Sequence, residues 1–156
     1  MSQENVEIVR RFMSAHEGED LIPLIREFAE RLGPEFQPHA VLAWWADDPG
    51  WQHAHPNIEW DSQVVEEQET AHGPTEVAVR WAGYLELWDS FVYRAVEYRD
   101  LGDWVLVPED IRARGRDGVA VEMRIFVLHH VREGKVAVYR SRRTEQEALK
   151  AVGLEE

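Results

Sequence analysis

WVLVPEDIRARGRDGVAVEMRIFVLHHVREGKVAVYRSRRTEQEALKAVG, residues 104–153, is the stretch that decides the fold class. Apolar and polar side chains alternate along it in three runs, and tight turns containing glycine separate the runs. Alternation with period two is typical of half-buried strands, so we expect strands over 104–114, 119–132 and 135–143, joined as hairpins. Thr144 and Glu147 fit a capping box, which predicts a short last helix that stops at Gly153.

The chain before Gln63 has apolar residues at helical spacing instead. We expect helices over about 3–17, from Asp20 to Gly33, and from Pro38 to the turn at 47–50. A strand is expected over 58–64, a helix from Gly73 to Trp88 and a strand over 91–99. Because no linker or repeat divides the chain, the sequence predicts one α+β domain, residues 1–156, with helices first and a sheet last.

The composition limits the classes of partner. The chain has 156 residues and a net charge of −13, which disfavours nucleic acid and anionic membranes because both would be repelled. It has no cysteine, which excludes a disulfide framework and thiolate sites and favours the cytoplasm. No apolar run approaches ~20 residues, so no membrane span is expected. Seven tryptophans either fill the core or line an aromatic cavity for a flat ligand.

The turns also predict which side chains share a face. A two-residue turn at Glu133-Gly134 pairs Arg132 with Lys135. One face then carries an apolar band, Val121, Met123, Ile125, Val127 and His129. The other face holds Arg124, Phe126, Tyr139 and Ser141 with Val105, Val107, Glu109 and Ile111. A β-bulge in any of these strands would invert part of this assignment.

Several motifs resemble one known family: SQENVEIVRR at 2–11, PNIEW at 56–60, HGP at 72–74, REGKV at 132–136 and EAL at 147–149. They are similar to actinobacterial members of the SnoaL-like, nuclear transport factor 2-like superfamily. The resemblance covers nearly the whole chain except an apparent insertion at about 30–55. It implies a cone-shaped, curved mixed sheet wrapped around the N-terminal helices, with a ligand pocket on the concave side. It also implies a homodimer through the convex face, here the apolar band.

The family's catalytic residues do not carry over. By this resemblance, the three polar positions of ketosteroid isomerase correspond to Phe12, Trp60 and Phe126, which argues against that activity. The last-strand aspartate of the cyclases and epoxide hydrolases corresponds to Ser141, which cannot act as a carboxylate base. We therefore expect Phe12, Trp60, Phe126 and Ser141 to contact a ligand rather than to react with it.

Candidate chemistry remains on the predicted concave face. Glu109 and Arg124 would be cross-strand neighbours, either as a simple ion pair or as a general acid or base tuned by an arginine. Tyr139 would orient a carbonyl or hydroxyl group. His16 ends the apolar stripe of the first helix, where it is either a satisfied core histidine or a pocket residue.

No metal or other cofactor is expected, because His53, His55 and His72 show no zinc-binding spacing. Three functions remain open. The first is acid–base catalysis on a hydrophobic ligand that bears a carbonyl or hydroxyl group, with Glu109 and Tyr139 as catalytic residues. The second is ligand binding without turnover, and the third is a structural dimer whose tryptophans fill its own cavity.

Overall fold

The computed structural model describes residues 2–63 and 69–154. The N-terminal helices are α1 (Ser2–Ser14), α2 (Leu21–Leu32) and α3 (Pro38–Asp47), followed by a 3₁₀ turn, η1 (Trp51–His53). The first strands are β1 (Ala54–Ser62) and β2 (Ala71–His72), and helices α4 (Gly73–Ala82) and α5 (Tyr84–Leu87) follow them. The rest is β3 (Trp88–Ala95), β4 (Arg99–Asp100), β5 (Trp104–Gly115), β6 (Ala120–Arg132), β7 (Lys135–Arg142) and α6 (Glu145–Ala151).

The helix ends follow the local sequence. Asp20 caps α2, because its carboxylate accepts a hydrogen bond from the N–H of Ile22 at 3.1 Å. Thr144 caps α6 in the same way, accepting from the N–H of Glu147 at 3.1 Å. The helix predicted from Gly73 to Trp88 is instead broken at Gly83, and Trp88 already begins β3. Val64, the predicted end of the first strand, lies outside the described residues.

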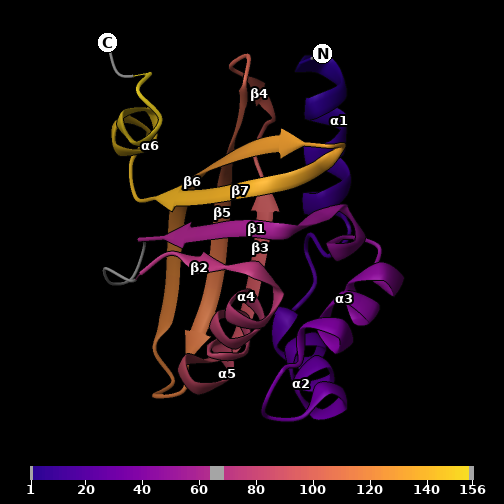
Figure 1. The fold of residues 1–156 in the computed structure, drawn as a ribbon. Coiled ribbons are helices and arrows are strands. Elements are labelled where there is room, and N and C mark those ends of the chain that lie inside the picture. The colour runs from indigo at the N-terminus through magenta and orange to yellow at the C-terminus, as the bar shows by residue number, and fades with distance from the viewer. Residues whose placement is uncertain (1, 64–68, 155–156) are drawn as a thin grey trace.

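The strands form one curved, mixed sheet in the order β2-β1-β7-β6-β5-β3, with β4 paired to β5. The β1–β7 pair is parallel and the other pairs are antiparallel. Figure 1 shows β5 and β6 as long ribbons, with α2 to α5 gathered near one end of the sheet and α6 apart from them. The predicted α+β class, with a curved sheet and N-terminal helices, is confirmed. No helix within 2–63 and 69–154 is long and apolar enough to cross a membrane.

The register shows one error in the predicted face assignment. The turn at Glu133-Gly134 is as predicted: both residues have positive φ, 56° and 74°, and Arg132 pairs with Lys135. The register then shifts between His130 and Val131, which is a β-bulge that places His129 opposite Tyr139. The pairing of β5 with β6 also differs by one residue from the pairing that the predicted faces require, since Arg114 pairs with Ala120.

One of these one-residue shifts lies between β5 and β6, and the other lies between β6 and β7. Together they leave the relative orientation of β5 and β7 as predicted. The predicted faces of β5 and β7 therefore stand, whereas β6 alone is inverted. The predicted apolar band turns inward: Ile125, Val127 and His129 are buried, and Val127 and Ile125 belong to the main core. The prediction that this band is a convex dimer interface is therefore wrong.

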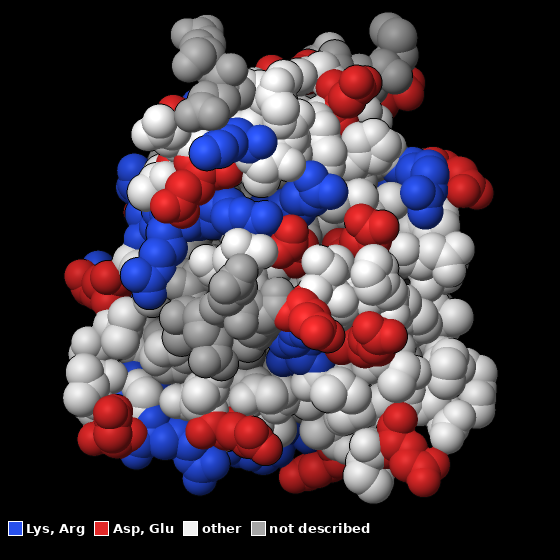
Figure 2. Space-filling model, turned by 60° about the vertical axis from the view of Figure 1, so that its left-hand side comes forward, with Lys and Arg blue, Asp and Glu red and all other residues white. Residues whose placement is uncertain are grey.

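The outer face of the sheet is divided in two. At one end, Leu106 and Leu128 pack with Ala148 of α6 in a second, small core. At the other end, β5 and β6 carry charged cross-strand pairs, Asp110 with Arg124 and Arg112 with Glu122. Figure 2 shows basic and acidic side chains in mixed groups on the face of the molecule that is turned to the viewer.

Candidate functional site

A cavity of about 510 Å³ lies against the inner face of the sheet, at the end covered by α4 and α5. Helix α1 contributes Phe12, Met13 and His16 to it. Eight of its other lining residues are aromatic: Trp51, Trp60, Trp81, Tyr84, Trp88, Phe91, Tyr93 and Tyr139. This volume is in the usual range for a site that holds a small organic molecule.

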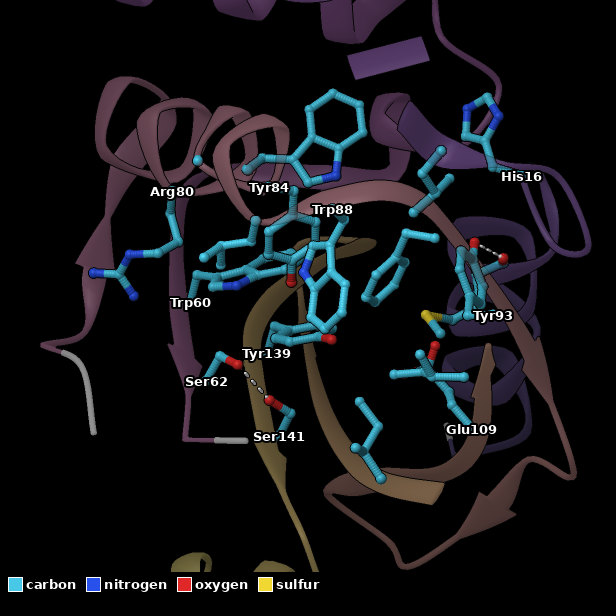
Figure 3. A pocket seen from close by; sticks show the side chains of 18 of the residues that line it. His16, Trp60, Ser62, Arg80, Tyr84, Trp88, Tyr93, Glu109, Tyr139 and Ser141 are labelled. Carbon is cyan, nitrogen blue, oxygen red and sulfur yellow. Dashed lines mark hydrogen bonds between the residues drawn. The ribbon is translucent and has the colours of Figure 1, made fainter. Parts of the chain in front are cut away.

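The rings are stacked on one another along one wall. Trp60 of β1 and Tyr139 of β7 are neighbours in the parallel pair, and their rings stack with centroids 3.7 Å apart and planes 5° apart. Trp51 stacks on Trp60 at 5.7 Å and on Trp45 at 4.9 Å. Figure 3 shows Trp60, Tyr84, Trp88 and Tyr139 close together on one side of the cavity. Such packing makes this wall flat and rigid.

Glu109 approaches the cavity from the other side, on β5 (Figure 3). The residue is only 4% exposed, and its Oε2 has no hydrogen-bond partner among the described residues. Burial raises the pKa of its carboxyl group to about 8, and the nearby Glu17 carboxylate adds to this. Glu109 is therefore mainly protonated at neutral pH, so it can donate a hydrogen bond or a proton.

Arg124 does not accompany Glu109. The inverted β6 places it on the outer face, where its Nε donates to Asp110 Oδ1 at 2.7 Å and its Nη2 to Asp110 Oδ2 at 3.0 Å. Phe126 also lies on the outer face, against the small core under α6. The predicted Glu109–Arg124 pair is wrong, and neither Arg124 nor Phe126 lines the cavity. The physical reason is the one-residue slip on each side of β6.

Tyr139 and Ser141 both line the cavity, as does Ser62 of the neighbouring β1. Ser141 Oγ donates to Ser62 Oγ at 2.9 Å, which places two hydroxyl groups at one edge of the aromatic wall (Figure 3). Burial, and then the nearby Glu109, raises the pKa of Tyr139 well above its ordinary value. Tyr139 therefore stays protonated and can act as a hydrogen-bond donor.

His16 is held by two carboxylates. Its Nε2 is 2.9 and 3.0 Å from the two oxygens of Asp48, and its Nδ1 is 3.3 Å from Glu19 Oε2. The hydrogen bond with Asp48 raises the pKa of His16, although burial opposes it. Both nitrogens of His16 contact carboxylates, which favours the protonated ring and leaves no free nitrogen to act as a base.

Asp48 is the main polar residue that the sequence analysis missed. Burial by itself would raise its pKa, but hydrogen bonds from His16 and from the N–H groups of Gly50 and Trp51 hold that pKa below its usual value. The signal was present: an aspartate before Pro49-Gly50 is typical of a turn in which the carboxylate accepts backbone hydrogen bonds. Its pairing with a histidine 32 residues earlier could not be read from local spacing.

Three further histidines do not converge on a metal site. No group of three or more metal-ligating side chains occurs within 2–63 and 69–154. His55 instead pairs with Glu133, with its Nε2 at 3.2 Å from Oε1.

No family model matches the chain, and no curated protein matches it. Solved structures are similar to it over nearly its full length. An NTF2-like protein of unknown function from Burkholderia pseudomallei has a TM-score of 0.56 at 15% identity, covering 94% of this chain and 95% of the other. A protein of Jannaschia sp. CCS1, assigned as a SnoaL-like polyketide cyclase, has a TM-score of 0.58 at 15% identity, covering 99% and 94%.

TerC, crystallised with polyporic acid, is similar with a TM-score of 0.58 at 14% identity, and the match covers 97% of each chain. At these identities the likeness establishes the fold, and the chemistry of each neighbour stays its own. The sequence resemblance is thus confirmed at the level of architecture: this chain has the fold of the SnoaL-like, nuclear transport factor 2-like superfamily.

Proposed function

We propose that this protein binds a small, hydrophobic molecule that carries a carbonyl or hydroxyl group, and that Glu109 moves a proton on that molecule. One observation carries the proposal: a buried carboxyl group with an unpartnered oxygen lies beside an aromatic cavity of about 510 Å³. Leaving a buried polar atom without a partner costs about 1–3 kcal/mol, which a bound ligand would recover. TerC, which has a similar fold, was crystallised with polyporic acid, and this supports a small-molecule ligand.

The chemistry follows from the protonation state of Glu109. As an acid, Glu109 donates its proton to the ligand oxygen, and as the resulting carboxylate it removes a proton from a neighbouring atom of the ligand. Glu109 gives up one proton and takes up another, so its carboxyl group is unchanged at the end. An isomerisation by this route needs no co-reactant. A carboxyl with a pKa of about 8 is well placed for both steps near neutral pH. Tyr139 supplies a second hydrogen bond to the ligand from the opposite wall.

A second candidate is binding without turnover. The nitrogens of His16 are engaged by Asp48 and Glu19, so the described cavity wall offers Glu109 no free histidine as a partner base. An aromatic wall with one protonated carboxyl is sufficient to bind a ligand. The third possibility, a cavity filled by its own tryptophans, is disfavoured by the open volume.

The test separates binding from proton transfer. Planar aromatic ketones are titrated against the tryptophan fluorescence, and the bound ketone is incubated in D₂O to follow exchange of the hydrogens next to its carbonyl group. Glu109→Gln keeps a hydrogen-bond donor but cannot move a proton. We expect it to bind with similar affinity and to slow exchange by about 100-fold or more. Asp110→Asn, on the outer face of the same strand, is the control and is expected to match the wild type.

Binding without exchange in the wild type would select the second candidate. Absence of any fluorescence response, together with no small molecule released on denaturation, would overturn both.

Homodimerisation is part of the same proposal, on the strength of the family resemblance. Because the band on β6 is buried, the interface would have to lie elsewhere on the surface. Light scattering on the purified protein tests it, with a mass near 36 kDa expected for two chains of 18.2 kDa.

A further inference from the structure

The cavity wall is rich in aromatic faces. Each aromatic ring carries negative charge density on its face, and a cation within about 6 Å of the ring centre is attracted to it. Tyr84 and Trp88 lie on one side of the cavity beside the stacked rings of Trp60 and Tyr139, and Tyr93 lies on the side of Glu109 (Figure 3). This wall favours a ligand with a positive charge over a neutral ligand of equal shape.

Among the described residues, none gives the buried carboxyl group of Glu109 a positive partner. Besides burial, the charged neighbour that acts on Glu109 is another carboxylate, Glu17. Two of the described lining residues are basic, His16 and Arg80. His16 is already held between Asp48 and Glu19, and the Nη2 of Arg80 donates to the carbonyl oxygen of Glu69 at 2.6 Å. Figure 3 shows the guanidinium of Arg80 directed away from the cavity and from Glu109.

The molecule as a whole also attracts cations. Its net charge of −13 raises the local concentration of positive ligands and lowers that of anions. Three features therefore favour a positively charged ligand: the aromatic faces, the Glu109 oxygen without a partner among the described residues, and the overall charge.

We infer that this cavity binds hydrophobic organic cations of the alkylammonium or arylammonium class, with the carboxylate of Glu109 as the counter-ion. The ammonium group supplies the positive partner that no described residue provides, and the aromatic wall contacts its methyl or methylene groups. Such a cation occupies the pocket of the proposed function, and it competes there with the carbonyl- or hydroxyl-bearing ligand, because it holds Glu109 in the ionised form that cannot donate.

A pair of matched probes tests this inference. Phenyltrimethylammonium and tert-butylbenzene have nearly the same shape and differ in one positive charge. Both are titrated at pH 7 by tryptophan fluorescence and calorimetry. We expect the wild type to bind the cation at least ~10-fold more tightly than its neutral isostere, as expected for a desolvated cation beside aromatic faces and a carboxylate.

Two Glu→Gln variants locate the effect. Glu109→Gln is expected to remove most of the preference for the cation, leaving the part that the aromatic faces and the overall charge provide, and to leave binding of tert-butylbenzene within about twofold. Glu122→Gln makes the same chemical change on the outer face, where Glu122 pairs with Arg112 at 3.4 Å. It is expected to keep the wild-type preference. Loss of the preference in both variants would assign it to overall charge and overturn the role of Glu109.

A second measurement needs no variant. Phenyltrimethylammonium cannot titrate, so a proton released when it binds must come from the protein. The other ionisable groups that act on or near Glu109 are Glu17, Tyr84, Tyr93, Tyr98 and Tyr139. Burial raises the pKa of Tyr84 and of Tyr98 to about 12, and that of the other two tyrosines further. His16 also lines the cavity, but the hydrogen bond with Asp48 raises its pKa and so opposes loss of its proton. Calorimetry in buffers of different ionisation enthalpy is expected to show release of nearly one proton at pH 7, and none with tert-butylbenzene.

Equal affinity for the two probes, or cation binding without proton release, would overturn the inference. Tight binding of aromatic ketones alongside either result would leave the proposed function standing, because that proposal needs only the protonated form of Glu109. Failure of every probe to bind would remove both.

Discussion

Glu109 and Asp110 are adjacent on β5 and have opposite environments. Glu109 faces inward, is 4% exposed and has an oxygen without a partner in the described part of the chain. Asp110 faces outward and forms two hydrogen bonds with Arg124, at 2.7 and 3.0 Å. Burial raises the pKa of Glu109 to about 8, whereas the hydrogen bond from Arg124 lowers the pKa of Asp110 despite slight desolvation.

The difference shows that the face of the sheet, and not the residue type, decides what a carboxylate does here. Successive side chains of a strand point to opposite faces, so one step along β5 moves a carboxyl from water and an arginine into a cavity of aromatic rings. Ionising a carboxyl group in that cavity costs free energy because the charge is removed from water. This cost raises the pKa toward neutral pH, where the group can give up or take up a proton.

The largest expected effect is on the pH dependence of stability, which should differ between variants of Glu109 and of Asp110. An unfolded glutamate has a pKa near 4.5, and folded Glu109 has a pKa of about 8, so the folded state binds more protons between these values. The free energy of unfolding therefore falls as pH rises through that window. Glu109→Gln removes the fall, and we expect its stability relative to the wild type to rise by about 4 kcal/mol from pH 4.5 to pH 8.

Urea unfolding at a series of pH values measures this change. Asp110→Asn is the matched comparison. It loses a surface ion pair, and its stability is expected to change by no more than about 1 kcal/mol at pH 8. If the two variants showed the same pH dependence, the contrast between the two faces would be wrong.

A packing variant sharpens the same comparison on β6. Ile125 is 5% exposed and belongs to the main core, so Ile125→Ala is expected to destabilise the fold by about 3 kcal/mol. Glu122→Ala changes an exposed residue of the outer face, and about 0.5 kcal/mol or less is expected. Urea midpoints of the two variants decide this; a larger loss for Glu122 would mean that β6 has the register predicted from the sequence.

Much of the fold could be predicted from local patterns. The alternation over 104–143, the Glu133-Gly134 turn and the caps at Asp20 and Thr144 are local features, and the structure has all of them. The orientation of β6 could not be predicted, because it depends on a bulge near Ala137 and on one residue more or less in the turn after Gly115. Tertiary packing selects both, since only the observed register buries Val127 and Ile125.

The site was predicted in part for the same reason. Glu109, Tyr139 and Ser141 lie on β5 and β7, whose faces were predicted correctly, and the structure brings them to the cavity with Phe12, His16 and Trp60. Arg124 and Phe126 lie on the inverted strand and were misplaced. Asp48 was missed because its contact with His16 joins segments 32 residues apart.

His129 provides a pH effect of opposite sign on the same inner face. It is fully buried, and neither ring nitrogen has a hydrogen bond of standard geometry among the described residues. Burial lowers its pKa to about 3, and the backbone of Val105 opposes this only in part. Because the unfolded histidine binds its proton near pH 6.5, the free energy of unfolding falls as pH decreases from 6.5 toward 3.

At pH 5 this loss is about 2 kcal/mol, at about 1.4 kcal/mol per pH unit. We expect His129→Gln to remove that slope when the two proteins are compared by urea unfolding between pH 6.5 and pH 5. The measurement is made in the Glu109→Gln background, which removes the opposing slope of Glu109. An unchanged slope would mean that His129 is hydrated or paired in the folded protein.

The smallest expected effect concerns Glu17, which accepts a hydrogen bond from the edge strand β3 and whose charge acts on Glu109. Its Oε1 accepts a hydrogen bond from the N–H of Ala95 at 2.6 Å, and Ala95 is the cross-strand partner of Glu109. Glu17→Gln keeps an oxygen for that hydrogen bond but removes the charge, so it is expected to lower the pKa of Glu109.

Asp20→Asn is the control, because Asp20 accepts from the N–H of Phe91 on the same edge strand. It is expected to leave the titration of Glu109 in place. Carbon-13 NMR of the side-chain carboxyl groups follows the titration directly, and an unmoved pKa in Glu17→Gln would show that burial alone sets the acidity of Glu109.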